Sequence, residues 1–350
     1  MPKIIALCFD GTWNTPDDDQ SDGDGSTNVR KLHDAILPTN ADGVQQAKWY
    51  ATGVGTKWYN KLRGGAMGVG LSTKIQKGYT HLVESWEEGD SICIFGFSRG
   101  AYCARSLVGL IRNAGLLRRE HVKLVPEAYA LYRTRDEGAD SETAKFFRGK
   151  YAREVPIHLL GVWDTVGALG IPVESFEWFN KAYYQFHDTE LSGIVRNAFH
   201  AVAVDEHRKN YSATLWNPKQ KPNQRVEQVW FSGAHANVGG GYAHTALSDI
   251  PLRWMMQKSQ TCGIAFDTNK MPAPPPVHPA IVDSYGEFLH GAYSRLIPRH
   301  YRTIGSTVHG VEAIDETVIQ RLRDDPDYRP KNAVESYLTG EIRPLGRLHV

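Results

Sequence analysis

The sequence predicts an α/β fold in which a mainly parallel central sheet is covered by helices on both faces. Short apolar runs typical of buried strands alternate with longer segments whose apolar residues recur at helical spacing. Several of these runs lead directly into polar or glycine-containing loops. In a parallel sheet such loops gather at the edge where the strands end, which is where open α/β sheets bind ligands. We therefore expect residues far apart in the sequence to meet at one edge.

Apolar runs at five places predict strands of this sheet. They are residues 3–9, 46–51, 91–95, 155–162 and 226–231. Helical periodicity predicts the remaining elements. They are residues 27–37, 71–88, 101–111, 116–151, 191–205, 247–260 and 313–322.

The length of 350 residues suits one large α/β domain. We expect a single domain over residues 1–350, with helical or lid-like excursions at 116–151 and 172–225. The second excursion contains an aromatic stretch, residues 176–184, that either lines an acyl pocket or packs in the core.

We expect neither a nucleic-acid partner nor a bound cofactor, from the net charge and the motifs of the sequence. The 40 basic and 39 acidic residues give a formal charge of +1, so net charge indicates neither nucleic acid nor an anionic membrane. A glycine-rich stretch at residues 64–70 resembles a dinucleotide loop but lacks the acidic residue that follows such loops. No tight cluster of metal ligands is visible, although Asp10 and the acidic loop at residues 17–26 leave a cation open. The scattered cysteines read as small core residues; they are Cys8, Cys93, Cys103 and Cys262.

The N-terminus is too short and too soon polar for a signal peptide, and no segment approaches membrane-spanning length. We expect a cytoplasmic protein without a transmembrane segment. Export by a route that reads no N-terminal signal stays open, as does transient contact with a membrane surface. The sequence does not predict the oligomeric state.

Ser98 is the predicted nucleophile. It stands in Gly96-Phe97-Ser98-Arg99-Gly100, a G-x-S-x-G that follows an apolar strand and precedes a helical pattern. A strand, a sharp turn and a helix form the context in which this motif exposes a serine at the top of a sheet. The alternative is a chance match in which Ser98 only caps the helix, because the chain contains 33 glycines.

Asp164 and His235 are the predicted partners of Ser98. Each comes directly after a predicted strand, and the order Ser, Asp, His is that of an α/β-hydrolase. A serine hydroxyl needs a base to take its proton, which His235 would do, and Asp164 would orient the imidazole and stabilise its charged form. Asp164 as a turn cap is the alternative reading, and other histidines among the 14 compete with His235.

The oxyanion of an acyl-transfer intermediate needs two hydrogen-bond donors. One is expected from the backbone N–H of Arg99, and the other from the loop that contains Gly11 and Thr12. Asp10 would bind the ligand, brace this loop or hydrogen-bond the region around Asn14, and we favour bracing.

Several segments resemble the DUF2235 family, the catalytic domain of type VI secretion lipase effectors of the Tle1 class. The matching segments occur in family order over about the first 260 residues: FDGTWN at 9–14, the glycine-rich region before Leu71, GFSRGAYCAR at 96–105, GVWDTVGALG at 161–170 and WFSGAHANVGGGY at 230–242. The resemblance implies an α/β-hydrolase fold, triad positions at Ser98, Asp164 and His235, and hydrolysis of lipid esters.

The chain departs from the family pattern at two places. Asn237 replaces an aspartate that family members often carry, and residues 314–318 lack the histidine of a late I-H-x-S-V motif. His309 is therefore a second candidate for the base.

The leading functional hypothesis is a serine esterase or lipase that acts on carboxyl esters, with phospholipids among the candidate substrates. A binding protein that keeps the fold without turnover is the non-enzymatic alternative. A phosphatase that uses Asp10 ranks lowest, because Cys8 stands where that motif requires an aspartate nucleophile.

Overall fold

Seven parallel strands form the central sheet, and the predicted fold class is confirmed. A computed structural model of the protein describes residues 1–11, 25–52, 66–134, 138–166, 190–217, 221–274, 278–288, 290–307, 311–332 and 334. In spatial order the strands are β2 (Gln46–Ala51), β1 (Ile4–Phe9), β3 (Ser91–Phe97), β6 (Ile157–Trp163), β7 (Val195–Ala203), β8 (Arg225–Phe231) and β9 (Glu312–Ile314).

The direction in which the chain crosses the sheet reverses at β1. The chain leaves β1 for β2 on one side and later returns to β3 on the other side, with all pairings parallel. At such a switch point the loops that follow the two neighbouring strands diverge to opposite faces and leave room for a ligand. The loops after β1 and β3 carry Gly11 and Ser98, so the topology places the predicted nucleophile at the switch point.

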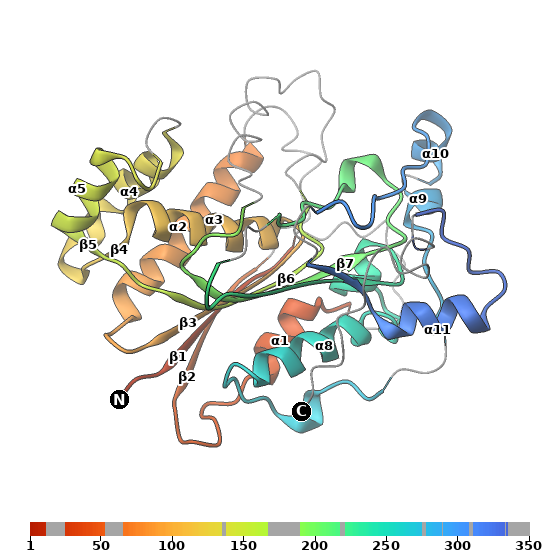
Figure 1. Ribbon diagram of the computed structural model, residues 1–350, viewed down its shortest axis with the longest axis horizontal. Coiled ribbons are helices and arrows are strands. Elements are labelled where there is room, and N and C mark those ends of the chain that lie inside the picture. Colours follow the sequence, from red (N-terminus) through yellow and green to blue (C-terminus); the bar gives the residue numbers. More distant parts are fainter. Residues whose placement is uncertain are drawn as a thin grey trace.

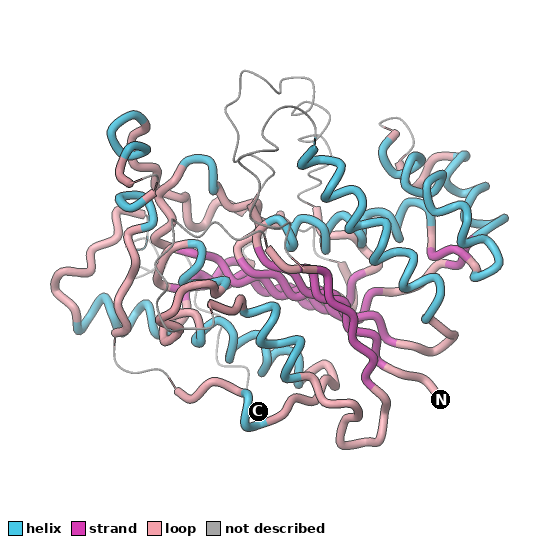
Figure 2. Tube along the Cα trace, turned by 180° about the vertical axis from the view of Figure 1, so that it is seen from behind, coloured by secondary structure: helices cyan, strands magenta, loops and turns pink. Residues whose placement is uncertain are grey.

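Helices cover both faces of the sheet (Figures 1 and 2). One face packs against α2 (Ala66–Ser85) and α3 (Arg99–Ala114), and α4 (Val125–Arg133) and α5 (Glu142–Tyr151) pack on α3. The other face packs against α1 (Asn28–Ala35) and α8 (Asp249–Gln260). The side chains of β1 alternate between the two cores, which is why every residue of that strand is buried.

A third apolar cluster supports the end of the sheet near the C-terminus. It joins β8 to α11 (Glu316–Asp324) and includes Trp230, Ile304 and Val318. The shorter elements among the described residues are β4 (Leu116–Leu117), η2 (Arg119–Leu124), β5 (Ala152–Arg153), η4 (Lys209–Tyr211), α7 (His235–Gly239), η5 (Thr268–Lys270), α9 (Ser284–Glu287) and α10 (Ala292–Leu296).

The helix expected at residues 191–205 is wrong. Val195–Ala203 is instead strand β7, between β6 and β8, and the part of the 172–225 excursion that contains it belongs to the sheet. This strand is covered on both faces, so residues 198–203 are all buried and lack the alternation of a half-buried strand, although one of them is His200. Its three alanines favour helix by intrinsic propensity, and burial between neighbouring strands overrides that preference.

The other expectations had mixed outcomes. Helices occur in the 116–151 excursion, whose Leu116, Val125 and Ala128 join the main core. The helix expected at 313–322 begins only at Glu316, since Glu312–Ile314 adds the last strand of the sheet. Residues 12–24 and 167–189, which include the acidic loop and the aromatic stretch, lie outside the described residues.

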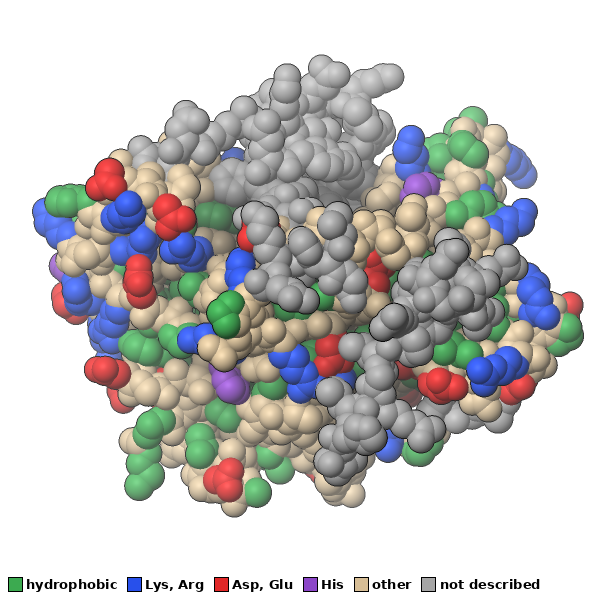
Figure 3. Space-filling view, viewed as in Figure 1, with side chains coloured by type: hydrophobic (Ala, Val, Ile, Leu, Met, Phe, Trp, Pro, Cys, Tyr) green, Lys and Arg blue, Asp and Glu red, His purple; other side chains and the backbone are tan. Residues whose placement is uncertain are grey.

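Charged side chains of both signs are interspersed over the face shown in Figure 3, in keeping with the small net charge. None of the helices in the described ranges combines the length and apolar character that crossing a membrane requires.

The turn after β3 packs so closely against the end of β1 that we expect only glycine to fit at position 100. A Cβ atom built on Gly100 would lie 2.1 Å from the Phe9 carbonyl oxygen, which is backbone and cannot turn away. We expect Gly100→Ala to lower the free energy of unfolding by about 1–3 kcal/mol or more in a denaturant titration. Gly149→Ala, in α5 with open space around it, is the matched control and should leave stability unchanged or raise it by up to about 1 kcal/mol. Equal effects of the two substitutions would contradict the packing described here.

Candidate active site

Ser98 lies on a strained turn between β3 and α3. Its φ of 58° and ψ of −123° lie outside the regions that non-glycine residues prefer. The flanking glycines make this turn possible. A Cβ atom on Gly96 would lie 2.5 Å from the Gly100 carbonyl oxygen, and Gly100 itself abuts Phe9. The conformation therefore depends on close backbone packing and matches the turn that the motif predicts.

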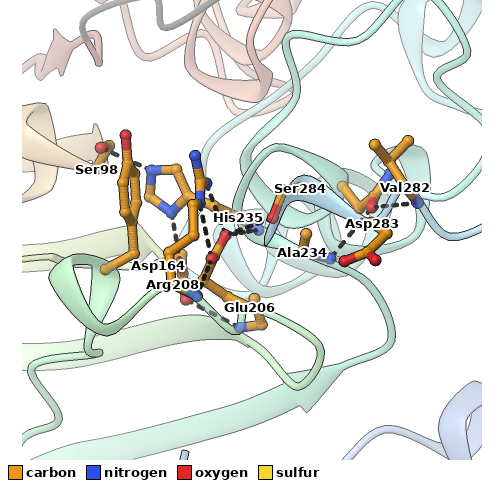
Figure 4. A network of polar contacts seen from close by, with 12 residues as sticks. Ser98, Asp164, Glu206, Arg208, Ala234, His235, Val282, Asp283 and Ser284 are labelled. Atoms are coloured by element: carbon orange, nitrogen blue, oxygen red, sulfur yellow. Dashed lines mark hydrogen bonds and ion pairs between the residues drawn. The ribbon is translucent and has the colours of Figure 1, made fainter. Parts of the chain in front are cut away.

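His235 lies between Ser98 and Asp164 (Figure 4). Its Nε2 is 2.7 Å from Ser98 Oγ, and its Nδ1 is 2.5 Å from Asp164 Oδ2. An ionised carboxylate only accepts hydrogen bonds, so Nδ1 carries the proton and Nε2 accepts from the serine hydroxyl. The structure thus brings together the three residues that follow β3, β6 and β8 in the sequence.

The loop after β8 delivers His235 as the first residue of α7. Gly233, two residues before His235, has a φ of +108°, a backbone conformation that glycine adopts much more readily than other residues. Asn237 fixes the start of the helix, because its Oδ1 accepts from the backbone N–H groups of Ala234 (3.1 Å) and Val282 (3.2 Å). The ring of His235 packs between Phe97 and Tyr211, with centroids 4.6 and 5.0 Å away.

Asp164 is completely buried and is held on both oxygens. Its Oδ1 accepts from the Ala203 backbone N–H (2.9 Å) and from Nη1 of Arg302 (2.6 Å), and its Oδ2 accepts from Nη2 of Arg302 (3.0 Å) as well as from His235. Bidentate arginine–carboxylate pairs are among the strongest polar contacts in proteins.

A second buried ion pair supports the backbone of His235. Glu206 Oε2 accepts from the His235 N–H (3.2 Å) and from Ser284 Oγ (3.1 Å). Arg208 binds both oxygens of Glu206, at 2.9 and 2.7 Å, and lies over the Tyr211 ring (Figure 4). The base is therefore fixed at its ring by Asp164 and at its main chain by Glu206.

The electrostatics of the site keep the acid ionised and the base neutral. Burial raises the pKa of the Asp164 carboxyl, but the charge of Arg302 and the bond from His235 outweigh burial and hold that pKa well below its usual range. Burial lowers the pKa of His235 below its ordinary value, and the attraction of Asp164 and Glu206 offsets this only in part. A neutral imidazole beside a carboxylate is the state that can accept the serine proton.

The other predicted site residues lie around Ser98. Arg99 opens α3 directly after the serine, which puts its backbone N–H at the positive end of that helix. Gly11 lies against the nucleophile, since a Cβ on it would be 3.3 Å from Ser98 Cβ, but its N–H donates to Asp10 Oδ1 (2.7 Å). Thr12, the other residue of this loop from which an oxyanion donor is expected, lies outside the described residues.

The Asp10 carboxylate is hydrogen-bonded within the protein, as expected for the bracing role. It is buried and accepts from Gly11 N–H, from Thr27 Oγ1 (2.9 Å) and from the Tyr50 hydroxyl. Burial raises its pKa, and these hydrogen bonds offset the shift in part.

The competing histidines occupy other places. His200 is buried below the site, where it accepts from Thr165 N–H (3.2 Å). Burial lowers the pKa of His200 to about 3, so it is neutral and structural. His207 contacts the His300 carbonyl oxygen (3.0 Å). His309 lies outside the described residues. Within the described part of the chain, no three His, Cys, Asp or Glu side chains cluster as metal ligands do.

Sequence reasoning missed Arg302, Glu206 and Arg208. Glu206 and Arg208 follow β7, the strand taken for a helix, so their place at the same edge was hidden. Arg302 follows no predicted strand and stands in a segment with weak patterning. A buried carboxylate requires a partner, so the need for a cation near Asp164 is the one signal that could have prompted a search for such a residue.

A family model described as "T6SS, Phospholipase effector Tle1-like, catalytic domain" matches residues 3–258. The chain belongs to this family. Family membership supports hydrolase activity, and the matched residues include Ser98, Asp164 and His235.

The chain is also similar to individual proteins. "Uncharacterized protein YEL023C" of Saccharomyces cerevisiae (strain ATCC 204508 / S288c) is 29% identical over 240 residues, which is 62% of this chain and 33% of the yeast protein. The chain therefore spans about a third of that relative's length. The crystal structure of an uncharacterized protein from Pseudomonas aeruginosa has a TM-score of 0.49 at 20% identity, covering 79% of this chain and 48% of that one. The structure of "the Tle1 effector bound to the VgrG spike from the Type 6 secretion system" has a TM-score of 0.41 at 20% identity, covering 69% and 51%.

The lowered pKa of His235 predicts activity that persists in mildly acidic solution. Because the base must be unprotonated, the acid limb of kcat/KM is expected at a midpoint below about 6.5, the ordinary value for histidine. The measurement is kcat/KM for a soluble ester as a function of pH. His158→Gln, a change at the opposite end of β6 from Asp164, is the control and should leave the midpoint in place. A midpoint clearly above 6.5 would contradict a base held in a desolvated pocket.

Proposed function

We propose that the protein is a serine hydrolase that cleaves carboxyl esters, with phospholipids as its substrate class. The observation that carries the proposal is the continuous chain from Ser98 Oγ through His235 to Asp164 Oδ2, with links of 2.7 and 2.5 Å. Membership in a phospholipase effector family supports lipid esters as substrates.

Acylation begins when Ser98 Oγ attacks the acyl carbonyl carbon while His235 Nε2 takes the hydroxyl proton. The imidazolium that forms keeps its Nδ1–H on Asp164, whose negative charge stabilises it. The carbonyl oxygen becomes an oxyanion and accepts a hydrogen bond from the Arg99 N–H at the start of α3. His235 then gives the proton to the leaving alcohol, the ester C–O bond breaks, and an acyl-serine remains.

Deacylation repeats these steps with water. The water molecule attacks the acyl carbon while His235 takes one of its protons. His235 returns that proton to Ser98 Oγ when the acyl–serine bond breaks. The products are the free fatty acid and the regenerated serine. Each step uses His235 as base and then as acid, so the site needs no second titrating group.

A phosphatase built on Asp10 is disfavoured by the position of that residue. The Asp10 side chain is buried and accepts hydrogen bonds from Thr27, Tyr50 and the Gly11 backbone. A carboxylate engaged in this way is not presented to a phosphoryl group. The Ser98 hydroxyl, by contrast, lies 2.7 Å from Nε2 of His235, the proposed base.

Active-site labelling tests the proposed nucleophile and base. We expect a fluorophosphonate probe to label the native protein, to fail on Ser98→Ala, and to label His235→Ala about 10²–10⁴-fold more slowly. Ser106→Ala is the matched control, because Ser106 is another buried serine of α3 and should not affect labelling. Labelling that survives in Ser98→Ala would contradict the assignment. A folded native protein that takes no label would favour the non-catalytic binding alternative.

Product analysis tests the bond that is cleaved. Incubation with phosphatidylcholine or phosphatidylethanolamine vesicles is expected to release free fatty acid and lysophospholipid, with no release by Ser98→Ala. Release of the headgroup or of diacylglycerol instead would contradict carboxyl-ester cleavage while leaving a phospholipase in place.

A further inference from the structure

We infer that Arg302 is a positioning residue of this site: its guanidinium fixes the Asp164 carboxylate and balances its charge, which sets how tightly His235 holds a proton. The effect of Arg302 on catalysis rests on the proposed function, in which His235 is the catalytic base. It concerns a residue beyond residues 3–258, the part of the chain that the family model matches.

Arg302 contacts the Asp164 carboxylate directly. The residue is 4% exposed, and its two terminal nitrogens bind the two carboxylate oxygens of Asp164 at 2.6 and 3.0 Å. The same nitrogens donate to the backbone carbonyls of Ala203 (2.8 Å) and Tyr211. The side chain therefore ties the end of β7 and the η4 turn to the carboxylate that orients the base.

The segment that carries Arg302 is anchored on both sides. The His300 N–H donates to the His207 carbonyl oxygen (2.9 Å), and His207 Nδ1 lies 3.0 Å from the His300 carbonyl oxygen. Two residues after the arginine, Ile304 is buried in the cluster that joins β8 to α11. The guanidinium is thus presented by a packed part of the fold.

His235 and Arg302 compete for the same carboxylate. His235 Nδ1 and Arg302 Nη2 both contact Asp164 Oδ2, so a protonated imidazole would stand next to a permanent cation across one oxygen. In a buried site such like charges repel strongly. Arg302 therefore opposes protonation of His235 while Asp164 favours it.

The charges that face this pair balance one another. Asp164 and Glu206 are the buried carboxylates, and Arg302 and Arg208 are the buried guanidiniums bound to them. Burial lowers the pKa of His200 on β7 to about 3 and raises the pKa of the Tyr242 phenol, so both groups are uncharged near neutral pH. With a neutral His235 the described groups sum to zero. Removal of Arg302 alone would leave one uncompensated negative charge, which a proton on His235 would neutralise.

A pH profile separates this role from simple support of the fold. Arg302→Gln is expected to lower the plateau of kcat/KM at least about tenfold, because Asp164 loses its bidentate partner, and to move the acid limb upward by about one pH unit. Arg302→Lys keeps the charge without the bidentate geometry, so the plateau should fall while the limb stays near its wild-type position.

Arg148→Gln is the matched control for loss of a buried arginine. Arg148, on α5, donates to the carbonyls of Asn113 and Ala139 (both 2.7 Å) and pairs with Glu154, away from the site. Its removal should lower stability and leave the acid limb unmoved. A wild-type acid limb in Arg302→Gln would overturn the inference. If Arg302→Gln does not fold, a wild-type plateau in Arg302→Lys would overturn it.

A titration that needs no turnover keeps the two proposals distinct. The pKa of His235 is measured by NMR of the labelled imidazole in Ser98→Ala, with and without Arg302→Gln. We expect a rise of about one pH unit in the double variant. If the native protein hydrolyses no ester and the rise is present, the proposed function fails and the electrostatic role of Arg302 stands. If it hydrolyses esters and the rise is absent, the inference about Arg302 fails alone.

Discussion

The site depends on one buried carboxylate. Asp164 is completely excluded from solvent, and an isolated charge there would cost several kcal/mol unless it were paired and hydrogen-bonded. Arg302, His235 and the Ala203 N–H supply the partners, and these groups come from three separate stretches of chain. Satisfying this carboxylate therefore brings β7, the loop after β8 and the segment before β9 to one place.

Backbone packing places Ser98 on the other side of His235 from Asp164. The chain reverses its direction across the sheet between β1 and β3, and the two loops there approach so closely that Gly100 has no room for a Cβ. This contact holds Ser98 in its strained conformation, facing His235. Asp164 is fixed by charge and Ser98 by sterics, so we expect substitutions at these two positions to act for different physical reasons.

Much of this arrangement follows from the sequence. The apolar runs that end at Phe9, Phe95 and Phe231 are recognisable strands, and parallel strands bring the residues after them to one edge. Ser98, Asp164 and His235 could be named because each is a chemically distinctive residue directly after a strand. The reversal at β1 could not be read from these runs, because strand order depends on packing across the whole sheet.

Strand β7 and Arg302 escaped sequence reasoning for two different reasons. The alanine-rich run of β7 has helical propensity, and only burial on both faces makes it a strand. Arg302 lies 138 positions from Asp164, and a lone arginine in a weakly patterned segment carries no local signal of its partner. Its role becomes visible only when the partners of a buried charge are traced through the folded chain.

The most direct test of the account is a crystal structure of the protein after reaction with a phosphonate ester probe. We expect phosphorus bonded to Ser98 Oγ, the phosphonyl oxygen within hydrogen-bonding distance of the Arg99 N–H, and Asp164 still bound by both His235 and Arg302. Phosphorus on a different side chain, or an Asp164 carboxylate turned away from His235, would contradict it.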